Sequence, residues 1–459
     1  MTAALAHRAA HGHARHDARG YALTGADAEA LAHHEQALGL LLAWRGGADG
    51  PLAQALAAAP GFVMAHVLQA WMLALGRDTR RIRQAHAPLA RARQALGVHQ
   101  AHEAHDVHEA HDAHEARGGP GNERERLHVA AIEALLADDY PRAKAQLCCL
   151  LEAWPRDVLA LHAAHALDYL SGDIDELEER VARVLPAWRD EGLPGRHAVL
   201  AMHAFGLVER GEVAAAERAA RAALALNPMD ARAHHVMAHV FETSERAAEG
   251  VRWFERHAPV WSTSRAVATH CAWHLALFHL ALGDRARAVA IHDRHILATQ
   301  TGELADLIDA SALLWRLHLA GGANDAATQR RAAALAEAWA PHLDDGFCSF
   351  SDIHAMLAFV GARDEVRAAR LLRSLQAAQA RPTRHGATTR ELGLPACRAL
   401  VAFSHGNDAL AVTLLAGLPA TAHRLGGSHA QRDVLHLTLM QAVQHLRKPS
   451  ARRPALEAG

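Results

Sequence analysis

The stretch RHAVLAMHAFGLVERGEVAAAERAARAALALNPMD (residues 196–230) decides the fold. Counted from His197, the 8th, 15th, 20th, 27th and 32nd positions hold Ala204, Gly211, Ala216, Ala223 and Pro228. Small side chains let two helices approach closely, a glycine forms a short turn and a proline ends a helix. The stretch therefore predicts two helices that pack against each other across a turn.

The same spacing returns 34 residues later, in a unit that starts at Ala231, and again in a unit that starts near Thr269. The matching small residues are Ala238 and Gly250 in the second unit and Ala276, Gly283 and Ala288 in the third. This pattern resembles the tetratricopeptide repeat, two antiparallel helices in about 34 residues. One unit cannot bury its apolar face alone, so neighbours are expected, and the first helices of successive units would line a concave surface.

Helical patterns also fill the chain outside this block. We expect helices at 27–44, with Asp27 as the N-cap, and at 62–75, 303–319, 365–380 and 421–446, and a frayed tail over residues 1–19. No stretch alternates as a strand would. The sequence thus predicts an all-α protein, a tetratricopeptide-repeat-like α-solenoid of antiparallel helix pairs. Residues 1–98 form its N-terminal helical part, 99–119 a His-rich insertion and 120–459 the superhelix.

Composition excludes several classes of function. The net charge is -2, which argues against nucleic acid or an anionic membrane as partner. No run of about 18 apolar residues or signal-peptide core is present, and the five cysteines form no CxxC pair. These features predict a cytoplasmic protein that binds neither nucleic acid nor membrane.

Histidine is unusually abundant, with 37 residues. Six of them recur every three residues in HQAHEAHDVHEAHDAHEARGG (99–119). A three-residue step turns about 300° around a helix, so these six make no single face. We interpret the segment as a solvated insertion; a weak, multidentate metal sponge is the alternative.

Ten strings, in order over about residues 20–446, carry a closer resemblance. They are FVMAHV (62–67), RLHVAAIEAL (126–135), ARVLPAW (182–188), AFGLVE (204–209), ALALNPMDARAHHVMAHVFE (223–242), THCAWHLALFHL (269–280), DLIDASALLWRL (306–317), FSDIHAMLA (350–358), GLPACRALVAFSHGND (393–408) and GGSHAQRDV (426–434). The chain resembles a bacterial member of the tetratricopeptide repeat protein 38 family. The resemblance implies the repeat fold and brings no established activity with it, and the His-rich insertion is not part of the family pattern.

Two interpretations of function follow. The first is an interaction scaffold that holds a partner peptide or ligand in its concave groove. The second is a small-molecule or metal site, enzymatic and hydrolytic in its simplest form, within the solenoid. The inner positions of the central units favour the second, because they hold His, Glu and Trp, whereas peptide-carboxylate clamps prefer Lys, Arg and Asn.

The central histidines are the candidate metal ligands. His235 and His239 are four residues apart, as are His270 and His274, so each pair shares a helix face. Glu242 lies one turn beyond His239 on that face. Neighbouring helices pack about 8–10 Å apart, so both pairs can converge on one divalent metal, with zinc the first choice and iron, manganese and nickel also compatible.

Glu242 is in addition the candidate general base, acting on a metal-activated water. Val236 follows His235, so the HExxH protease signature is absent. Acidic and imidazole groups that could orient the ligands are Asp293, His295, Asp309, Asp352 and His354. The other interpretation of the same histidines is a hydrogen-bonded polar seam between helices.

Overall fold

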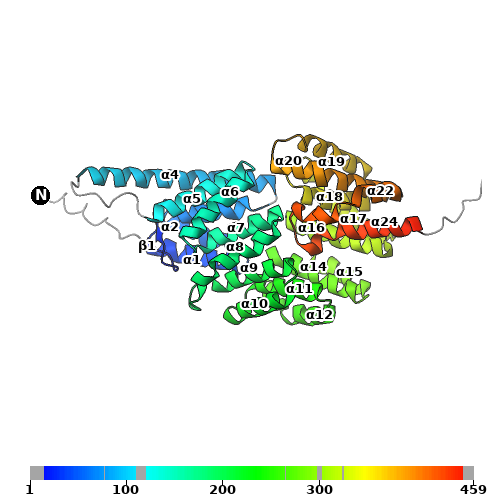
Figure 1. Ribbon diagram of the computed structural model, residues 1–459, viewed down its shortest axis with the longest axis horizontal. Coiled ribbons are helices and arrows are strands. Elements are labelled where there is room, and N and C mark those ends of the chain that lie inside the picture. The colour runs from blue at the N-terminus through cyan, green and yellow to red at the C-terminus, as the bar shows by residue number, and fades with distance from the viewer. Residues whose placement is uncertain are drawn as a thin grey trace, which may run out of the picture. The chain divides into compact units, whose positions relative to one another are not determined.

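The computed structural model describes residues 15–76, 78–109, 120–263, 265–296, 302–322 and 325–447. Most of these residues are helical, so the protein is all-α, as predicted. The chain divides into two compact units, Met1–His295 and Ile296–Gly459, hereafter the first and second units (Figure 1). No helix in the described ranges combines the length and the apolar character that a bilayer crossing requires.

The elements of the first unit follow in chain order. They are β1 (Arg15–His16), β2 (Ala22–Leu23), α1 (Ala28–Leu42), α2 (Asp49–Ala58), α3 (Val63–Ala74), α4 (Thr79–Glu109), α5 (Pro120–Leu136), α6 (Tyr140–Ala153), α7 (Val158–Ser171), α8 (Ile174–Val184), η1 (Leu185–Trp188), α9 (Arg196–Glu209), α10 (Val213–Leu226), α11 (Ala231–Thr243), α12 (Ala247–Arg256), α13 (Ala258–Trp261), α14 (Arg265–Ala281) and α15 (Arg285–His295).

Local sequence explains where these helices begin and end. Asp27 caps α1, as predicted, because its carboxylate accepts a hydrogen bond from the Ala30 N–H at 2.7 Å. Asp157 and Asp230 cap α7 and α11 in the same way. Gly211 separates α9 from α10 with φ at 83°, which a residue with a side chain rarely adopts. The predicted turn of the central repeat is therefore present.

Packing in the first unit brings one set of helices together. α7 packs on α9, α9 packs on α11, and α11 packs on α14, while α10 and α12 lie between these elements in sequence. Gly250, one of the small residues at the repeat positions, allows a close approach, because a Cβ there would meet the Phe278 ring at 2.6 Å. Gly206 of α9, which the repeat positions did not include, does the same, because a Cβ on it would lie 2.6 Å from the Glu178 Cα of α8.

The N-terminal residues correct one expectation. Residues 15–19 do not form a frayed tail, because β1 pairs with β2 and the side chains of Asp17 and Arg19 are buried. Arg19 donates to both carboxylate oxygens of Glu35 in α1, at 3.0 and 2.6 Å. The charges that suggested a solvated tail are neutralised in this network instead. Residues 1–14 lie outside the described residues.

The His-rich segment falls partly outside the described residues. α4 continues as a helix to Glu109, and residues 110–119 are not described. The prediction of a solvated insertion therefore stays a prediction.

The second unit is also helical throughout its described residues. Its elements are α16 (Leu304–Leu317), η3 (His318–Gly322), α17 (Ala326–Trp339), η4 (Ala340–His342), α18 (Ser349–Gly361), α19 (Glu365–Ala378), α20 (Arg384–Thr388), η5 (Thr389–Gly393), α21 (Leu394–Ser404), α22 (Asp408–Leu415), η6 (Pro419–Leu425), α23 (His429–Arg432) and α24 (Val434–Arg447).

The core of the second unit is formed by α16, α18, α21 and α24, which pack on one another. Trp315 of α16 donates to the Thr438 hydroxyl of α24 at 2.8 Å and fixes these two helices together. The predicted helices at 303–319 and 365–380 are present as α16 and α19. The predicted helix at 421–446 is broken, because Gly426 and Gly427 take positive φ values of 71° and 84° between η6 and α23.

Candidate metal centre

Two neighbouring helices of the first unit carry the predicted ligands. α11 supplies His235 and His239, and α14 supplies His270 and His274. Residues four apart share a helix face, and α11 packs directly on α14, so the two pairs face each other. The sequence-based prediction of four converging imidazoles is met.

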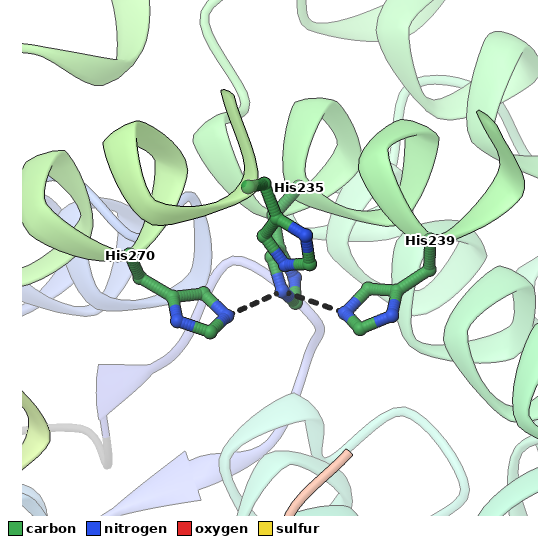
Figure 2. Close-up of side chains that lie close together, drawn as sticks. His235, His239 and His270 are labelled. Carbon is green, nitrogen blue, oxygen red and sulfur yellow. Dashed lines mark hydrogen bonds between the residues drawn. The ribbon is translucent and has the colours of Figure 1, made fainter. Parts of the chain in front are cut away.

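The ring nitrogens lie close together (Figure 2). The His235 Nε2 atom is 2.9 Å from His270 Nε2 and 3.0 Å from His239 Nε2. One ring nitrogen from each of the four histidines, His274 included, lies within 4.8 Å of the others. His235, His239 and His274 are buried, and His270 is half-buried. Four potential ligand atoms therefore surround a single small volume.

Hydrogen bonding alone does not satisfy this arrangement. A neutral imidazole nitrogen carries either one proton or one in-plane lone pair, so His235 Nε2 can make one good hydrogen bond and faces two neighbouring nitrogens. Protonation does not relieve the conflict. Burial, helped by the charges of His239, His270 and Arg232, holds the pKa of His235 well below its usual range. A cation that accepts the lone pairs of all the rings removes the conflict.

The donor set fits a transition metal. Zinc binds imidazole nitrogen at about 2.0–2.1 Å, which sets neighbouring nitrogens of a tetrahedral site roughly 3.3 Å apart. The observed 2.9 and 3.0 Å separations need only small side-chain shifts to reach that value. Imidazole also suits copper, nickel and iron, whereas magnesium and calcium prefer oxygen ligands.

Aromatic side chains wall the cluster. The Phe205 ring of α9 stacks on His235 with centroids 5.9 Å apart and meets His239 edge-on at 5.3 Å. Trp44 lies 5.2 Å from His235, and Trp273 stacks on His270 at 5.4 Å. A shell of this kind lowers the local dielectric and limits the access of water. Among the described residues, His235 Nδ1 has no hydrogen-bond partner, so ring contacts orient this imidazole.

Glu242 lies beside the cluster. Its Oε2 atom is 3.7 Å from His274 Nδ1, and it is not one of the four groups whose ligand atoms converge. A carboxylate on the outer nitrogen of a ligating imidazole orients the ring and raises its basicity. Glu242 would have this role if His274 bound the metal through Nε2. The predictions of Glu242 as a ligand and as a general base stay predictions.

The remaining candidates are placed as follows. Asp293 lies 3.0 Å from His292 Nδ1, and His295 ends α15; burial lowers the pKa of His295. Asp309, Asp352 and His354 belong to the second unit. Asp309 accepts a hydrogen bond from Gln431, and His354 Nδ1 lies 2.7 Å from the Phe350 carbonyl oxygen. Burial raises the pKa of Asp352 to about 8.

Sequence reasoning missed several residues around the histidines, namely Trp44, His162, Phe205 and Arg232. Trp44 follows α1 and had no repeat position to mark it. The available signal was Arg232, which precedes His235 by three residues and therefore shares its helix face.

No protein-family model matches the chain. The geometry of the cluster therefore carries the functional argument.

Proposed function

We propose that the first unit holds one divalent transition metal, zinc being the first choice, on His235, His239, His270 and His274. The observation that carries this proposal is the position of His235 Nε2, which lies within 3.0 Å of two other imidazole nitrogens in a buried, aromatic-walled volume. In a hydrogen-bonded polar seam, this one nitrogen would have to serve both neighbours with a single proton or a single lone pair, so a metal accounts better for the arrangement.

We propose further that the metal serves metal-dependent hydrolysis. A divalent ion at the four histidines would lower the pKa of a water bound at an additional coordination position to near neutrality. In the simplest scheme the oxygen of that water would bond to the substrate's electrophilic carbon or phosphorus. Glu242 would take the proton and pass it to the leaving group as the bond to that group breaks. The support for Glu242 is its place beside the cluster, with its Oε2 atom 3.7 Å from His274 Nδ1.

The scaffold for this site is, in our proposal, a tetratricopeptide-repeat-like solenoid of the tetratricopeptide repeat protein 38 family. Its support is the 34-residue spacing in the sequence and the row of packed helices α7, α9, α11 and α14. In such a fold the first helix of each repeat lines the inner surface. The alternative use of that surface is to bind a partner peptide, and the experiment below separates the two.

The experiment measures bound metal in full-length protein purified without an affinity tag. All variants carry glutamine in place of His99, His102, His105, His108, His111 and His114, so that the His-rich segment does not contribute. We expect about one equivalent of metal in this parent and its loss in the His235→Ala/His274→Ala double variant. His34→Leu, which changes a buried histidine of α1, is the matched control and should keep the metal.

A folded parent that holds no metal after exposure to zinc, cobalt, nickel or iron would overturn the metal centre. If that metal-free parent instead binds peptides, and the double variant loses this binding, the peptide-binding alternative stands.

A further inference from the structure

Arg232 lies on α11, three residues before His235 and on the same helix face as that histidine. Arg232 is buried, with an exposed fraction of only 4%. Its Nε donates to the carbonyl oxygen of Leu42 at 3.3 Å, and its Nη2 donates to His162 Nδ1 at 2.9 Å. The guanidinium lies 4.6 Å from the centre of the Trp44 ring, which in turn lies 5.2 Å from the His235 ring.

This guanidinium has no carboxylate partner. Among the described residues, no Asp or Glu oxygen lies within 4.0 Å of Arg232, whereas the other deeply buried arginines, Arg19, Arg124 and Arg180, all form salt bridges. Burial lowers the pKa of Arg232 to about 10, and the more distant Asp230 opposes the shift. A buried cation without a counter-ion is costly, because it loses the solvation of water and no opposite charge replaces it.

Local structure offsets only part of this cost. Leu42 is the last residue of α1, so the Arg232 guanidinium lies at the C-terminal end of that helix. The helix dipole places the equivalent of roughly half a negative charge there. The Trp44 face adds a cation–π contact. These contacts engage Nε, Nη2 and the flat face, and no described residue accepts a hydrogen bond from Nη1.

The surrounding imidazoles cannot supply negative charge. Burial and the Arg232 charge lower the pKa of His162 well below its ordinary value and that of His165 to about 3, so both rings are neutral near pH 7. Four neutral histidine ligands would leave a bound divalent metal with its full charge. The metal and Arg232 together would then place uncompensated positive charge in one buried region.

We propose that the first unit binds an oxyanion, a carboxylate or phosphate group of its substrate, at Arg232 beside the four-histidine centre. This inference rests on the proposed metal centre and names the class of substrate that the centre takes. The oxyanion accepts a hydrogen bond from the guanidinium, while the metal stands next to the bond to be hydrolysed. Trp44, which follows the end of α1, and His270 of α14 both contact His235 and are both partly exposed.

The test uses full-length protein loaded with Co²⁺, whose visible spectrum reports on the coordination shell. The probes are inorganic phosphate and acetate, titrated at constant ionic strength with calorimetry and the spectrum as readouts. Arg232→Met removes the positive charge, and Arg232→Lys keeps the charge but lacks the planar guanidinium with its paired N–H donors. Arg246→Met is the control, because Arg246 already pairs with Glu217 and Glu249.

We expect phosphate, acetate or both to bind the Co²⁺ protein. Arg232→Met should weaken this binding by roughly tenfold to a hundredfold, which corresponds to a lost charged hydrogen bond. The affinity of Arg232→Lys for the anion should lie between those of the parent and Arg232→Met. Arg246→Met should bind the anion as the parent does. The Co²⁺ stoichiometry should be the same in all variants. Preference for phosphate over acetate, or the reverse, identifies the group.

These measurements distinguish the oxyanion site from the metal centre. If Co²⁺ binds and neither anion binds, or both bind Arg232→Met as tightly as the parent, the oxyanion site is overturned and the metal centre stands. If Co²⁺ does not bind, the same titrations on metal-free protein decide the oxyanion site alone. Should Arg232→Met fail to fold, the decision rests on Arg232→Lys and on whether phosphate raises the parent's unfolding temperature above that in matched chloride.

Discussion

The Nε2 atom of His235 lies 2.9 Å from the Nε2 atom of His270, across the contact between α11 and α14. The same His235 nitrogen faces His239 at 3.0 Å. Without a cation, only one of these two contacts can be a good hydrogen bond. Removal of one imidazole ring should therefore lower the stability of the metal-free protein only slightly and that of the metal-bound protein strongly.

His270→Ala tests this asymmetry. A metal that binds only the folded state raises the unfolding temperature, and the rise grows with the logarithm of the free metal concentration. With the His-rich segment changed to glutamine, zinc should raise the parent's unfolding temperature by several degrees, about 2–4 °C per kcal/mol of added stability. The variant should lose most of this rise while matching the parent in excess chelator. An equal rise in both proteins would place the stabilising zinc elsewhere.

A second prediction concerns the close approach of α8 and α9. A Cβ on Gly206 would lie 2.6 Å from the Glu178 Cα and 2.8 Å from the Leu177 carbonyl oxygen, both backbone atoms. Gly206→Ala should therefore destabilise the first unit by about 1–3 kcal/mol in urea unfolding, because the helices must move apart. Gly39→Ala in α1 is the control, since a Cβ there meets nothing within 4 Å. It should stabilise by about 0.5–1 kcal/mol. Equal effects at both sites would show that α8 and α9 do not pack this closely.

A third prediction concerns Asp157, which joins α5 to the start of α7 in the first unit. Its Oδ2 atom accepts from Arg124 at 3.1 Å and lies 3.0 Å from His128 Nε2, while Oδ1 caps α7 through the Ala160 N–H. Asp157→Ala leaves a buried guanidinium short of a partner and should cost about 3–5 kcal/mol. Asp139→Ala removes an exposed N-cap alone, at the start of α6, and should cost about 1 kcal/mol. Urea midpoints that fall equally in the two variants would contradict a special role for the Asp157 network.

The convergence of the histidines was predictable because it depends on local periodicity. Spacings of four residues put His235 with His239 and His270 with His274, and the repeat spacing brought their helices together. Glu242 was predictable only in part. Its helix face was correct, but its 3.7 Å approach to His274 Nδ1, outside the four groups whose ligand atoms converge, depends on the side-chain packing between α11 and α14.

Trp44 and the Arg232 environment were not predictable from repeat spacing. The hydrogen bond from Arg232 to Leu42 joins residues 190 positions apart, and a repeat array specifies contacts only between neighbouring units. The burial of Asp17 and Arg19 was missed for a similar reason, since charged residues at a chain end signal solvent unless their partners are known.

A fourth prediction concerns the His-rich segment. In a helix, their three-residue spacing would distribute the six histidines around the axis, so the sequence predicts no single face that packs on the first unit. Deletion of residues 99–117 should leave the cooperativity and midpoint of thermal unfolding unchanged in chelator, and should lower the capacity for weakly bound nickel. A broadened transition or a large loss of helix signal in circular dichroism would show that the segment supports the fold.

The fifth prediction concerns acid lability caused by His34. This residue of α1 is buried at 2% exposure, its ring lies 5.0 Å from Phe62, and neither ring nitrogen has a hydrogen-bond partner among the described residues. Burial lowers the pKa of His34 to about 4; the charge of Glu35 opposes the shift and that of Arg19 adds to it. The unfolded chain, with an ordinary histidine pKa of about 6.5, therefore binds a proton between pH 6.5 and 4 that the folded protein does not.

The sign of the effect follows from that difference. Stability associated with His34 is present in full above about pH 6.5 and is lost as the pH falls toward 4, by at most roughly 3 kcal/mol. His34→Leu removes this loss, so the variant should exceed the parent in urea midpoint at pH 4.5 by clearly more than at pH 7.5. Chelator in all samples keeps metal release from the four-histidine centre out of the comparison, and the other buried histidines are common to both proteins. A midpoint difference that is the same at both pH values would mean that His34 is not the group that titrates.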